Sequence, residues 1–217
     1  MLQENLLKKP RHQLSKFMKF TQTNNELILA SKSKVRKEIL EKNDISCKVI
    51  SSNIDEEPIK QNLINKGASP ELISKNLAEA KATKVSLQNQ DQIVLGADSV
   101  IDLQNTIISK PKNRKEALEI LKKLNGKKHN LISSVSIARN GMMIWNYTDK
   151  AVLTMKKFQE TELVEYLSLI PDEKLYAYNV YQIEGEGRSL FAKIEGDENT
   201  IMGLPIDKIK KYLGNYE

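Results

Sequence analysis

Asp98 is the residue of this sequence whose surroundings most strongly suggest chemistry. It lies in the run QIVLGADSVID, where almost every neighbour between Ile93 and Ile101 is apolar or small. An ionised carboxylate in such a segment needs a cation, a metal ion or hydrogen-bond donors to offset its desolvation. Gly96, just before it, permits close approach of backbone or ligand. Asp98 is therefore a candidate catalytic or metal-binding carboxylate, and the alternative is a strand end that caps a turn.

A serine-rich turn, LASKSKVR, is a candidate anion site. An apolar strand leads into it and a helix leaves it, so free backbone N–H groups, the hydroxyls of Ser31 and Ser33 and the Arg36 guanidinium converge there. The turn is not a Walker loop, because it has neither a glycine nor the GK[ST] ending. The alternative is that Ser31 only caps the helix and Arg36 is a surface charge.

Two lysines and two glutamates are further candidates. Lys81 in AEAKA and Lys110 in ISKP stand among small or turn residues, where each is either a phosphate-binding cation or an ordinary surface lysine. Glu56 and Glu57 precede Pro58, and carboxylate oxygens are the ligands that Mg²⁺ and Mn²⁺ prefer. Acidic residues before a proline also occur as plain loop decoration, so each of these residues is weak evidence by itself.

Cysteine and histidine usage excludes several classes of site. Cys47 is the single cysteine, which excludes an internal disulfide and argues against a thiolate metal cluster. His12 and His129 stand among polar residues in the sequence and suggest neither a zinc site nor a triad with Cys47. A chain of this kind is typical of a reducing compartment, and a cytoplasmic location is expected.

The elements that must position these residues are strands and helices in mixed order. The buried run 92–102 is typical of a strand covered on both faces, and Asn113 and Gly126 bound the clearest helix. Asn140-Gly141 between apolar runs indicates a hairpin. The second hairpin strand is expected to continue through 151–158. Further strands are predicted at 26–31, 47–52 and 106–111, with a pair at 180–185 and 189–196, and further helices at 31–42, 70–87, 160–170 and 204–213. This pattern predicts one mixed α/β fold of two lobes.

Length and charge narrow the class of protein. The chain has 217 residues, of which 40% are hydrophobic, enough for one large domain. We expect residues 1–25 to be a poorly ordered extension and residues 26–217 to form a single domain. The net charge of +6 suits an anionic ligand, but the basic residues are spread along the chain among acidic ones, which argues against nucleic-acid binding. No apolar run approaches the ~18 residues of a membrane span.

The candidate residues occur in the order of one known family. The sequence resembles the Maf family of nucleoside triphosphate pyrophosphatases, also called septum-formation inhibitor-like proteins. The stretches that carry the resemblance lie between residues 27 and 213, and they are LILASKSKVRKEIL, IDEEP, LAEAKA, VLGADSVI, ISKPKNRKEALEILKKLNGKKH and IEGDENTIMGLPI.

The resemblance implies a fold, a reaction and a set of roles. It implies a central mixed sheet flanked by helices, with two lobes around a nucleotide-binding cleft, and hydrolysis of a nucleoside triphosphate to the monophosphate and pyrophosphate. A divalent cation, Mg²⁺ or Mn²⁺, and a homodimer in the cytoplasm are also implied. Asp98 matches the family's catalytic aspartate and Glu56 its metal-holding acid. The phosphate-binding positions of the family fall on Ser31, Ser33, Arg36, Lys81 and Lys110.

The base-specificity positions of the family fall on Val35, Ser99 and Glu184. In this respect the chain is more similar to the subgroup that acts on 7-methyl-GTP than to the thymidine and uridine subgroup. A carboxylate at Glu184 can accept from guanine N1–H and its exocyclic amine together, which thymine and uracil cannot offer. One departure is Tyr178-Asn179, where the family usually has Ala-Gly; asparagine tolerates a left-handed backbone better than most residues.

A second hypothesis belongs to another class. A nucleic-acid or cell-division-apparatus binding protein could keep this fold and work through its basic surface without catalysis. Asp98, Lys81 and Lys110 favour the enzyme, because a binding protein has no need of a buried carboxylate. Binding to nucleic acid would fall steeply with salt and would need no Mg²⁺.

Overall fold

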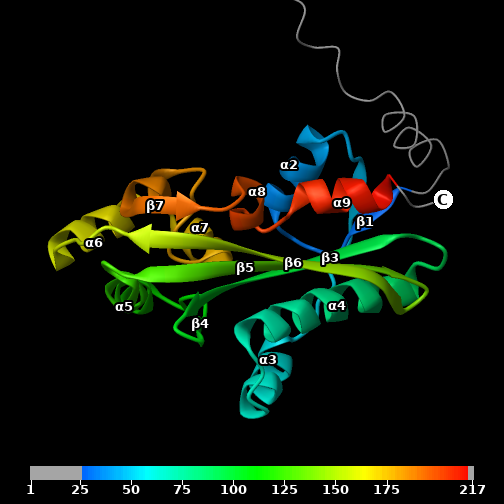
Figure 1. The fold of residues 1–217 in the computed structure, drawn as a ribbon, viewed down its shortest axis with the longest axis horizontal. Helices are drawn as coiled ribbons and strands as arrows, with labels where there is room; N and C mark the ends of the chain where they lie inside the picture. The colour runs from blue at the N-terminus through cyan, green and yellow to red at the C-terminus, as the bar shows by residue number, and fades with distance from the viewer. Residues whose placement is uncertain (1–25, 215–217) are drawn as a thin grey trace, which may run out of the picture.

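A mixed β-sheet is the frame of the molecule (Figure 1). The computed structural model describes residues 26–214, so the extension predicted at residues 1–25 lies outside the described residues. Seven strands pair in the order β2-β1-β3-β5-β6-β7, and β4 pairs with β3 off this path. The strands are β1 (Leu27–Leu29), β2 (Cys47–Val49), β3 (Val94–Leu103), β4 (Thr106–Ile108), β5 (Lys128–Arg139), β6 (Met142–Met155) and β7 (Phe191–Glu195).

The sheet changes from parallel to antiparallel pairing at β3. β1 is parallel to both β2 and β3. The pairs β3–β5, β5–β6 and β6–β7 are each antiparallel. The hairpin predicted at Asn140-Gly141 is confirmed, since both residues have positive φ (52° and 78°), as a tight turn between twisted strands requires. The predicted mixed α/β fold is therefore confirmed, with the sheet at its centre.

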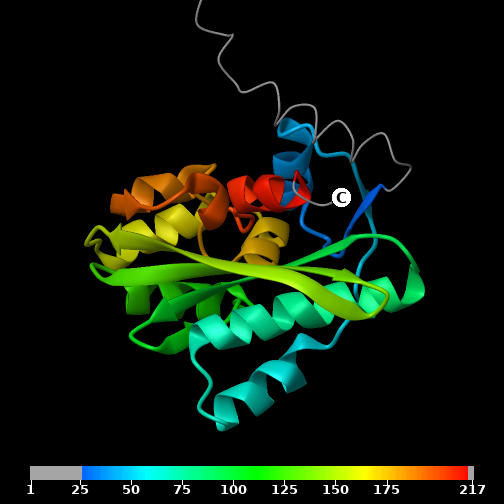
Figure 2. The same cartoon turned by 45° about the vertical axis from the view of Figure 1, so that its right-hand side comes forward.

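Helices cover both faces of the sheet. In Figures 1 and 2, α4 and α3 lie on one face, and α2, α8 and α9 lie on the other. α5 and α6 pack against each other towards one end of the molecule. The helices are α2 (Lys34–Lys42), α3 (Glu56–Asn65), α4 (Pro70–Gln88), α5 (Arg114–Leu124), α6 (Glu160–Ser168), α7 (Asp172–Tyr178), the 3₁₀ turn η1 (Glu186–Leu190), α8 (Glu198–Ile201) and α9 (Ile206–Leu213).

Gly96 lets α4 approach β3 unusually closely. A Cβ at this position would lie 2.3 Å from the Ala78 carbonyl oxygen and 2.7 Å from the Ala82 backbone nitrogen. Any side chain would therefore push α4 off the sheet. The close approach predicted for Gly96 is confirmed, and it places Lys81 of α4 within reach of Asp98 on β3.

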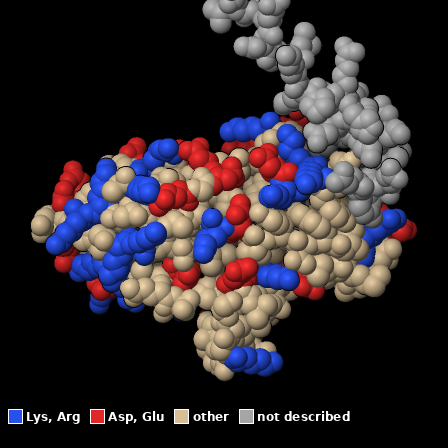
Figure 3. Space-filling model, in the orientation of Figure 1, with Lys and Arg blue, Asp and Glu red and all other residues tan. Residues whose placement is uncertain are grey.

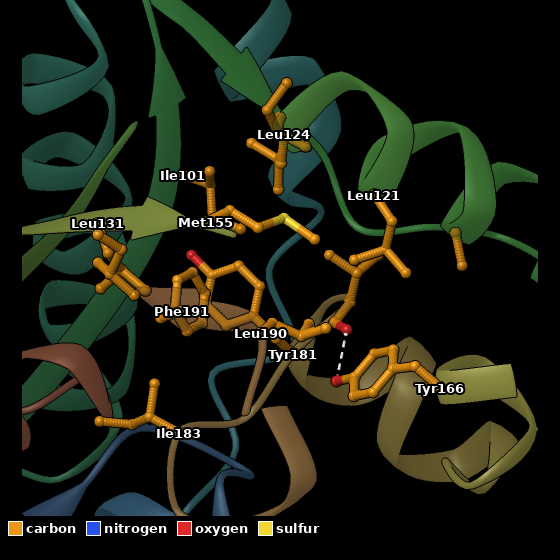
Figure 4. Close-up of a cluster of buried hydrophobic side chains, with 14 of the residues drawn as sticks. Ile101, Leu121, Leu124, Leu131, Met155, Tyr166, Tyr181, Ile183, Leu190 and Phe191 are labelled. Atoms are coloured by element: carbon orange, nitrogen blue, oxygen red, sulfur yellow. Dashed lines mark hydrogen bonds between the residues drawn. The ribbon is translucent and has the colours of Figure 1, made fainter. Parts of the chain in front are cut away.

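The core is divided between the two ends of the sheet. Leu27, Leu40 and Leu213 belong to a cluster that joins β1, α2 and α9. The other large cluster joins α5, α6 and the segment before β7, and Figure 4 shows its aromatic members around Met155. Burial of such side chains supplies most of the folding free energy. Within residues 26–214, no helix is both long and apolar enough to cross a membrane.

The predicted strand pair around Gly185 and Gly187 is wrong. β7 pairs instead with β6, with Val152 opposite Glu195. Residues 180–185 form a tight turn, because a Cβ on Gly187 would lie 2.5 Å from the Gln182 backbone nitrogen and leaves no room for an extended pair. The turn is tied to α6 by Tyr166, whose hydroxyl donates to the Val180 carbonyl at 3.0 Å (Figure 4).

Candidate active site

A single large cavity collects the residues that the sequence singled out. Its volume is about 970 Å³, at the upper end of the usual range for small-molecule sites. Its walls come from the turn after β1, the starts of α2 and α3, α4, β3, and the segments 107–112, 179–184 and 201–203. The predicted residues that line it are Ser31, Ser33, Val35, Arg36, Glu56, Lys81, Asp98, Ser99, Lys110 and Glu184.

Lys81 bridges the two predicted metal-site carboxylates. Its ammonium lies 2.7 Å from Asp98 Oδ1 and 2.9 Å from Glu56 Oε1. Asp98 and Lys81 are buried, at 6% and 8% exposure, whereas the Glu56 side chain is 48% exposed. Ion pairing to Lys81 offsets the desolvation of Asp98, so Lys81 is the cation that a buried carboxylate at this position was expected to need. α3 begins at Glu56, capped by Asp55, so the acidic corner is a helix start rather than a plain loop.

The second oxygen of Asp98 is the most informative atom of the site. Oδ2 is buried and has no hydrogen-bond partner among the described residues. Buried carboxylate oxygens are normally satisfied, so an unpaired one on a residue that lines the cavity is a candidate ligand contact. Glu56 shares Lys81 as a partner with the other oxygen of Asp98, Oδ1.

A divalent cation fits this donor set only with help from a ligand. No group of three or more His, Cys, Asp or Glu able to hold a metal occurs within residues 26–214. Mg²⁺, however, is usually held by one or two carboxylates together with substrate phosphates and water. Asp98 and Glu56 supply two such carboxylates, and Asp98 Oδ2 is unpaired within the described part of the chain. The residues therefore fit Mg²⁺ or Mn²⁺ as a partner of a phosphate ligand.

Arg36 is held by bonds from four directions. Its Nε donates to the Gly203 carbonyl (3.0 Å), Nη1 to the Ala97 carbonyl (2.9 Å) and to Ser31 Oγ (3.3 Å), and Nη2 to Ser99 Oγ (3.1 Å). Ser33 caps α2 by accepting from the Arg36 backbone N–H at 3.3 Å. The guanidinium is therefore a positive charge of fixed orientation at the cavity wall.

Lys110 stands at the cavity edge with a perturbed amine. Desolvation by the surrounding cavity walls lowers the pKa of Lys110 below its ordinary value, and the nearby Arg36 charge lowers it further. The residue still keeps part of its surface in contact with solvent. Crowding of cations of this kind is expected where an anion is to be bound. Lys60, which the sequence reading did not single out, donates to Ser109 beside Lys110 and holds α3 against this segment.

Charges nearly balance around the cavity. Six cationic and five acidic residues line it: Lys32, Arg36, Lys60, Lys81, Lys110 and Lys112 against Glu56, Glu57, Asp98, Glu116 and Glu184. Six minus five leaves one positive charge, which is too little to neutralise a polyphosphate. An additional cation would complete the balance.

The 179–184 segment forms another part of the wall. Gln182 Nε2 donates to Glu184 Oε1 at 3.2 Å, and both side chains line the cavity. Asn179 has a positive φ of 79°, where the family has glycine, but its ψ of −171° lies outside the left-handed helical region that was predicted. Tyr181 is buried, and its hydroxyl lies 2.9 Å from His129 Nε2.

The prediction that His129 lies in polar surroundings is wrong. The residue is 2% exposed and packs against Tyr181 and Phe191. Burial lowers the pKa of His129 to about 4. The alternation of β5 turns this side chain inward, a signal that Leu131 and Ser133 at the same spacing also give.

Fold and cavity together define an α/β enzyme built to act on a phosphate compound: one buried carboxylate, several fixed cations and room for a nucleotide. Residues 26–216 match the family described as Maf-like protein. The chain belongs to this family.

Relatives agree with this assignment. The chain is 65% identical over 188 residues, 87% of this chain and 96% of that protein, to a "Nucleoside triphosphate pyrophosphatase" of Pelagibacter ubique. It is 38% identical to a "7-methyl-GTP pyrophosphatase" of Brucella abortus, over 83% of this chain and 91% of that protein. Among solved structures, a HAM1 protein from Coxiella burnetii has 15% identity and a TM-score of 0.40 over 60% of this chain and 73% of that one, too weak a likeness to support an argument.

Proposed function

We propose that this protein is a nucleoside triphosphate pyrophosphatase that hydrolyses its substrate to the monophosphate and pyrophosphate. The observation that carries the proposal is the buried Asp98 carboxylate, with Oδ1 on Lys81 and an unpaired Oδ2, in a cavity lined by cations. The Pelagibacter relative, at 65% identity, bears this activity in its name.

The reaction assigns a task to each group. Asp98 accepts a proton from a water that attacks the α phosphorus, and the bond from that phosphorus to the bridging oxygen breaks. Lys81 holds the Asp98 carboxylate in position through its bond to Oδ1. Arg36, Lys110, Ser31 and Ser33 bind the phosphates and stabilise the charge that develops on the leaving pyrophosphate. Asp98 and Glu56 would hold a divalent cation, which supplies charge neutralisation and polarisation of the phosphoryl oxygens when bound.

A guanine-type base is the proposed specificity. Glu184 offers a carboxylate at the cavity wall, held on one oxygen by Gln182, and can accept from guanine N1–H and its exocyclic amine. The Brucella relative is named for 7-methyl-GTP, which supports a guanine form as substrate. Val35 lies on the same cavity wall and would bound the base pocket.

The wider role follows from this chemistry. Removal of modified or non-standard nucleotides from the pool, in the cytoplasm, is the role that we propose. We further propose a homodimer, supported by the apolar residues exposed on β6, Met142 at 67% and Ile144 at 38%. Sedimentation equilibrium tests this point, with twice the mass of one chain expected.

The decisive experiment measures pyrophosphate release from GTP, 7-methyl-GTP, ITP, 8-oxo-GTP, UTP, dTTP and CTP, with Mg²⁺, Mn²⁺ or EDTA. Release from guanine forms that needs the metal and is lost in Asp98→Asn is the expected result, since a positioned base is worth roughly 10² to 10⁴-fold. A Glu79→Gln variant, on the same helix as Lys81 but outside the cavity lining, is the control.

Silence across the panel from folded protein would contradict the proposal and favour the binding alternative. Basic and acidic side chains alternate over the face shown in Figure 3 rather than forming a basic stripe. That face gives nucleic-acid binding little support. Binding to duplex DNA or RNA that weakens steeply with salt and ignores Mg²⁺ would reverse this judgement.

A further inference from the structure

A chain of hydroxyl groups runs from Arg36 into the sheet. Arg36 Nη2 donates to Ser99 Oγ, which lies 2.8 Å from Ser133 Oγ. Ser133 Oγ donates in turn to the Thr200 carbonyl oxygen at 2.7 Å. Ser133 lies in the middle of β5 at 0% exposure and does not line the cavity. Its hydrogen bond to a side chain that lines the cavity is the one to Ser99.

The direction of every bond in this chain follows from proton counting. A hydroxyl has one proton to donate, and Ser133 gives its proton to the Thr200 carbonyl, which can only accept. The bond between the two serines is therefore donated by Ser99. Since Ser99 has given away its only proton, it meets Arg36 as an acceptor, which is what a guanidinium requires. All the bonds run one way, from the cation to the carbonyl.

The far end of the chain closes on Arg36 again. The Thr200 carbonyl also accepts from the Gly203 backbone N–H at 3.0 Å, and the Gly203 carbonyl accepts from Arg36 Nε. A Cβ on Gly203, whose φ is 94°, would lie 3.0 Å from both Arg36 Nε and Ser99 Oγ. Ser133 is thus bonded to two of the four supports of the guanidinium, directly to Ser99 on β3 and through Thr200 to the turn after α8.

We propose that Ser133 is a positioning residue of the active site: acting through Ser99, it fixes the Arg36 guanidinium in the orientation that binds the substrate polyphosphate. The proposal rests on the proposed function for its substrate. It also changes the role expected for Ser99, whose proton is committed to Ser133 and is not available to a nucleobase.

The kinetic test compares Ser133→Ala with Ser134→Ala. Ser134 is the matched control: it is the next residue of β5, is also 0% exposed, and has a hydroxyl bond of its own, to Thr148 at 2.9 Å. We expect Ser133→Ala to raise KM for GTP about 3- to 10-fold, the worth of one hydrogen bond, with kcat within about 2-fold. Ser134→Ala should leave KM unchanged at a similar loss of thermal stability. Ser133→Cys, which fills the same space with a weak donor, should fall between.

A double-mutant cycle tests the path through Ser99. If Ser133 acts through Ser99, adding Ser133→Ala to Ser99→Ala changes KM little further. Full additivity of the two effects on KM would overturn the proposal, as would an equal rise of KM in Ser134→Ala.

A readout without turnover separates this proposal from the proposed function. The Nε–H signal of Arg36 in ¹H–¹⁵N spectra, assigned by its loss in Arg36→Lys, should shift in Ser133→Ala and stay in place in Ser134→Ala. An unmoved signal in Ser133→Ala overturns the positioning role even if the protein hydrolyses nucleotides. If the signal shifts in Ser133→Ala but the wild-type protein hydrolyses none of the nucleotides, the positioning role of Ser133 stands and only the pyrophosphatase assignment is contradicted.

Discussion

The Lys81 ammonium lies 2.7 Å from one carboxylate oxygen of Asp98, and both side chains are buried. The same ammonium reaches Glu56 on α3 at 2.9 Å, so it links the helix over the sheet, the strand beneath and the acidic corner. Lys81 was expected to bind phosphate, and its position gives it a second task as the counter-ion of the proposed base. The pair depends on Gly96, which allows the two elements to approach.

Replacing Lys81 alone should lower the free energy of unfolding more than replacing Lys81 and Asp98 together. Lys81→Met leaves the Asp98 charge buried without its ion pair, and we expect a loss of about 3 kcal/mol in the free energy of unfolding. Adding Asp98→Asn to this variant removes the uncompensated charge, so the double variant should be less destabilised than Lys81→Met alone. Urea unfolding of the four proteins measures the coupling. Lys84→Met, an exposed lysine of α4, is the control, and equal losses in the two lysine variants would refute the pairing.

Lys110 should limit activity at alkaline pH. Desolvation and the Arg36 charge lower the pKa of Lys110, so its ammonium loses its proton, and its attraction for phosphate, earlier than an ordinary lysine as pH rises. The profile of kcat/KM, which reports the free enzyme, should therefore fall on the alkaline side. Lys110→Arg keeps its charge there and should extend the plateau to higher pH. An alkaline limb that is the same in Lys110→Arg and in a Lys112→Arg control would exclude Lys110 as its origin.

Much of the site could be predicted because its residues follow local rules. Asp98 stands out in an apolar strand, and the serine-rich turn precedes a helical pattern, although the cap is Ser33 and not Ser31. The mixed sheet and most of its helices follow from apolar periodicity and turn residues in the same way. All ten predicted residues line one cavity.

The rest depends on contacts between segments distant in sequence. Ser133 looks like any inward-facing serine of β5 until Thr200, 67 residues later, is folded against it. Residues 180–185 alternate between apolar and polar side chains, which predicts a strand. The close approach of Gly187 to the Gln182 backbone produces a turn instead. Acidic residues before Pro58 also fit a plain loop, whereas a proline in the first turn of a helix is well tolerated, and α3 begins at Glu56.

His129 should make the fold less stable in acid. Burial lowers the pKa of His129 from 6.5 to about 4, with partial opposition from the Asp102 charge. The unfolded chain therefore binds the proton more readily, and stability contributed by neutral His129 is present above pH 6.5 and is lost as pH falls towards 4, up to about 3 kcal/mol. His129→Gln does not titrate in this window. Urea unfolding from pH 7 to 4 should show a steeper loss for the wild type, and parallel curves would show that His129 is not buried as a neutral ring.

Glu184 should determine which nucleobase the enzyme prefers. Its carboxylate lines the cavity, with Oε1 accepting from Gln182, and an ionised acceptor can take both guanine donors at once. Glu184→Gln has only one accepting atom and presents an N–H group beside a donor. We therefore expect kcat/KM for GTP and 7-methyl-GTP to fall about 10- to 100-fold, the worth of a charge-assisted hydrogen bond, with UTP changed less than about 3-fold.

The matched control for this variant is Glu186→Gln, because Glu186 is an exposed glutamate two residues further along that does not line the cavity. It loses the same charge from the same segment, so it corrects for any general effect on nucleotide attraction. Equal losses for GTP and UTP in Glu184→Gln would mean that the carboxylate acts on the phosphates or on the fold. The guanine assignment would then fail, while hydrolysis through Asp98 would stand.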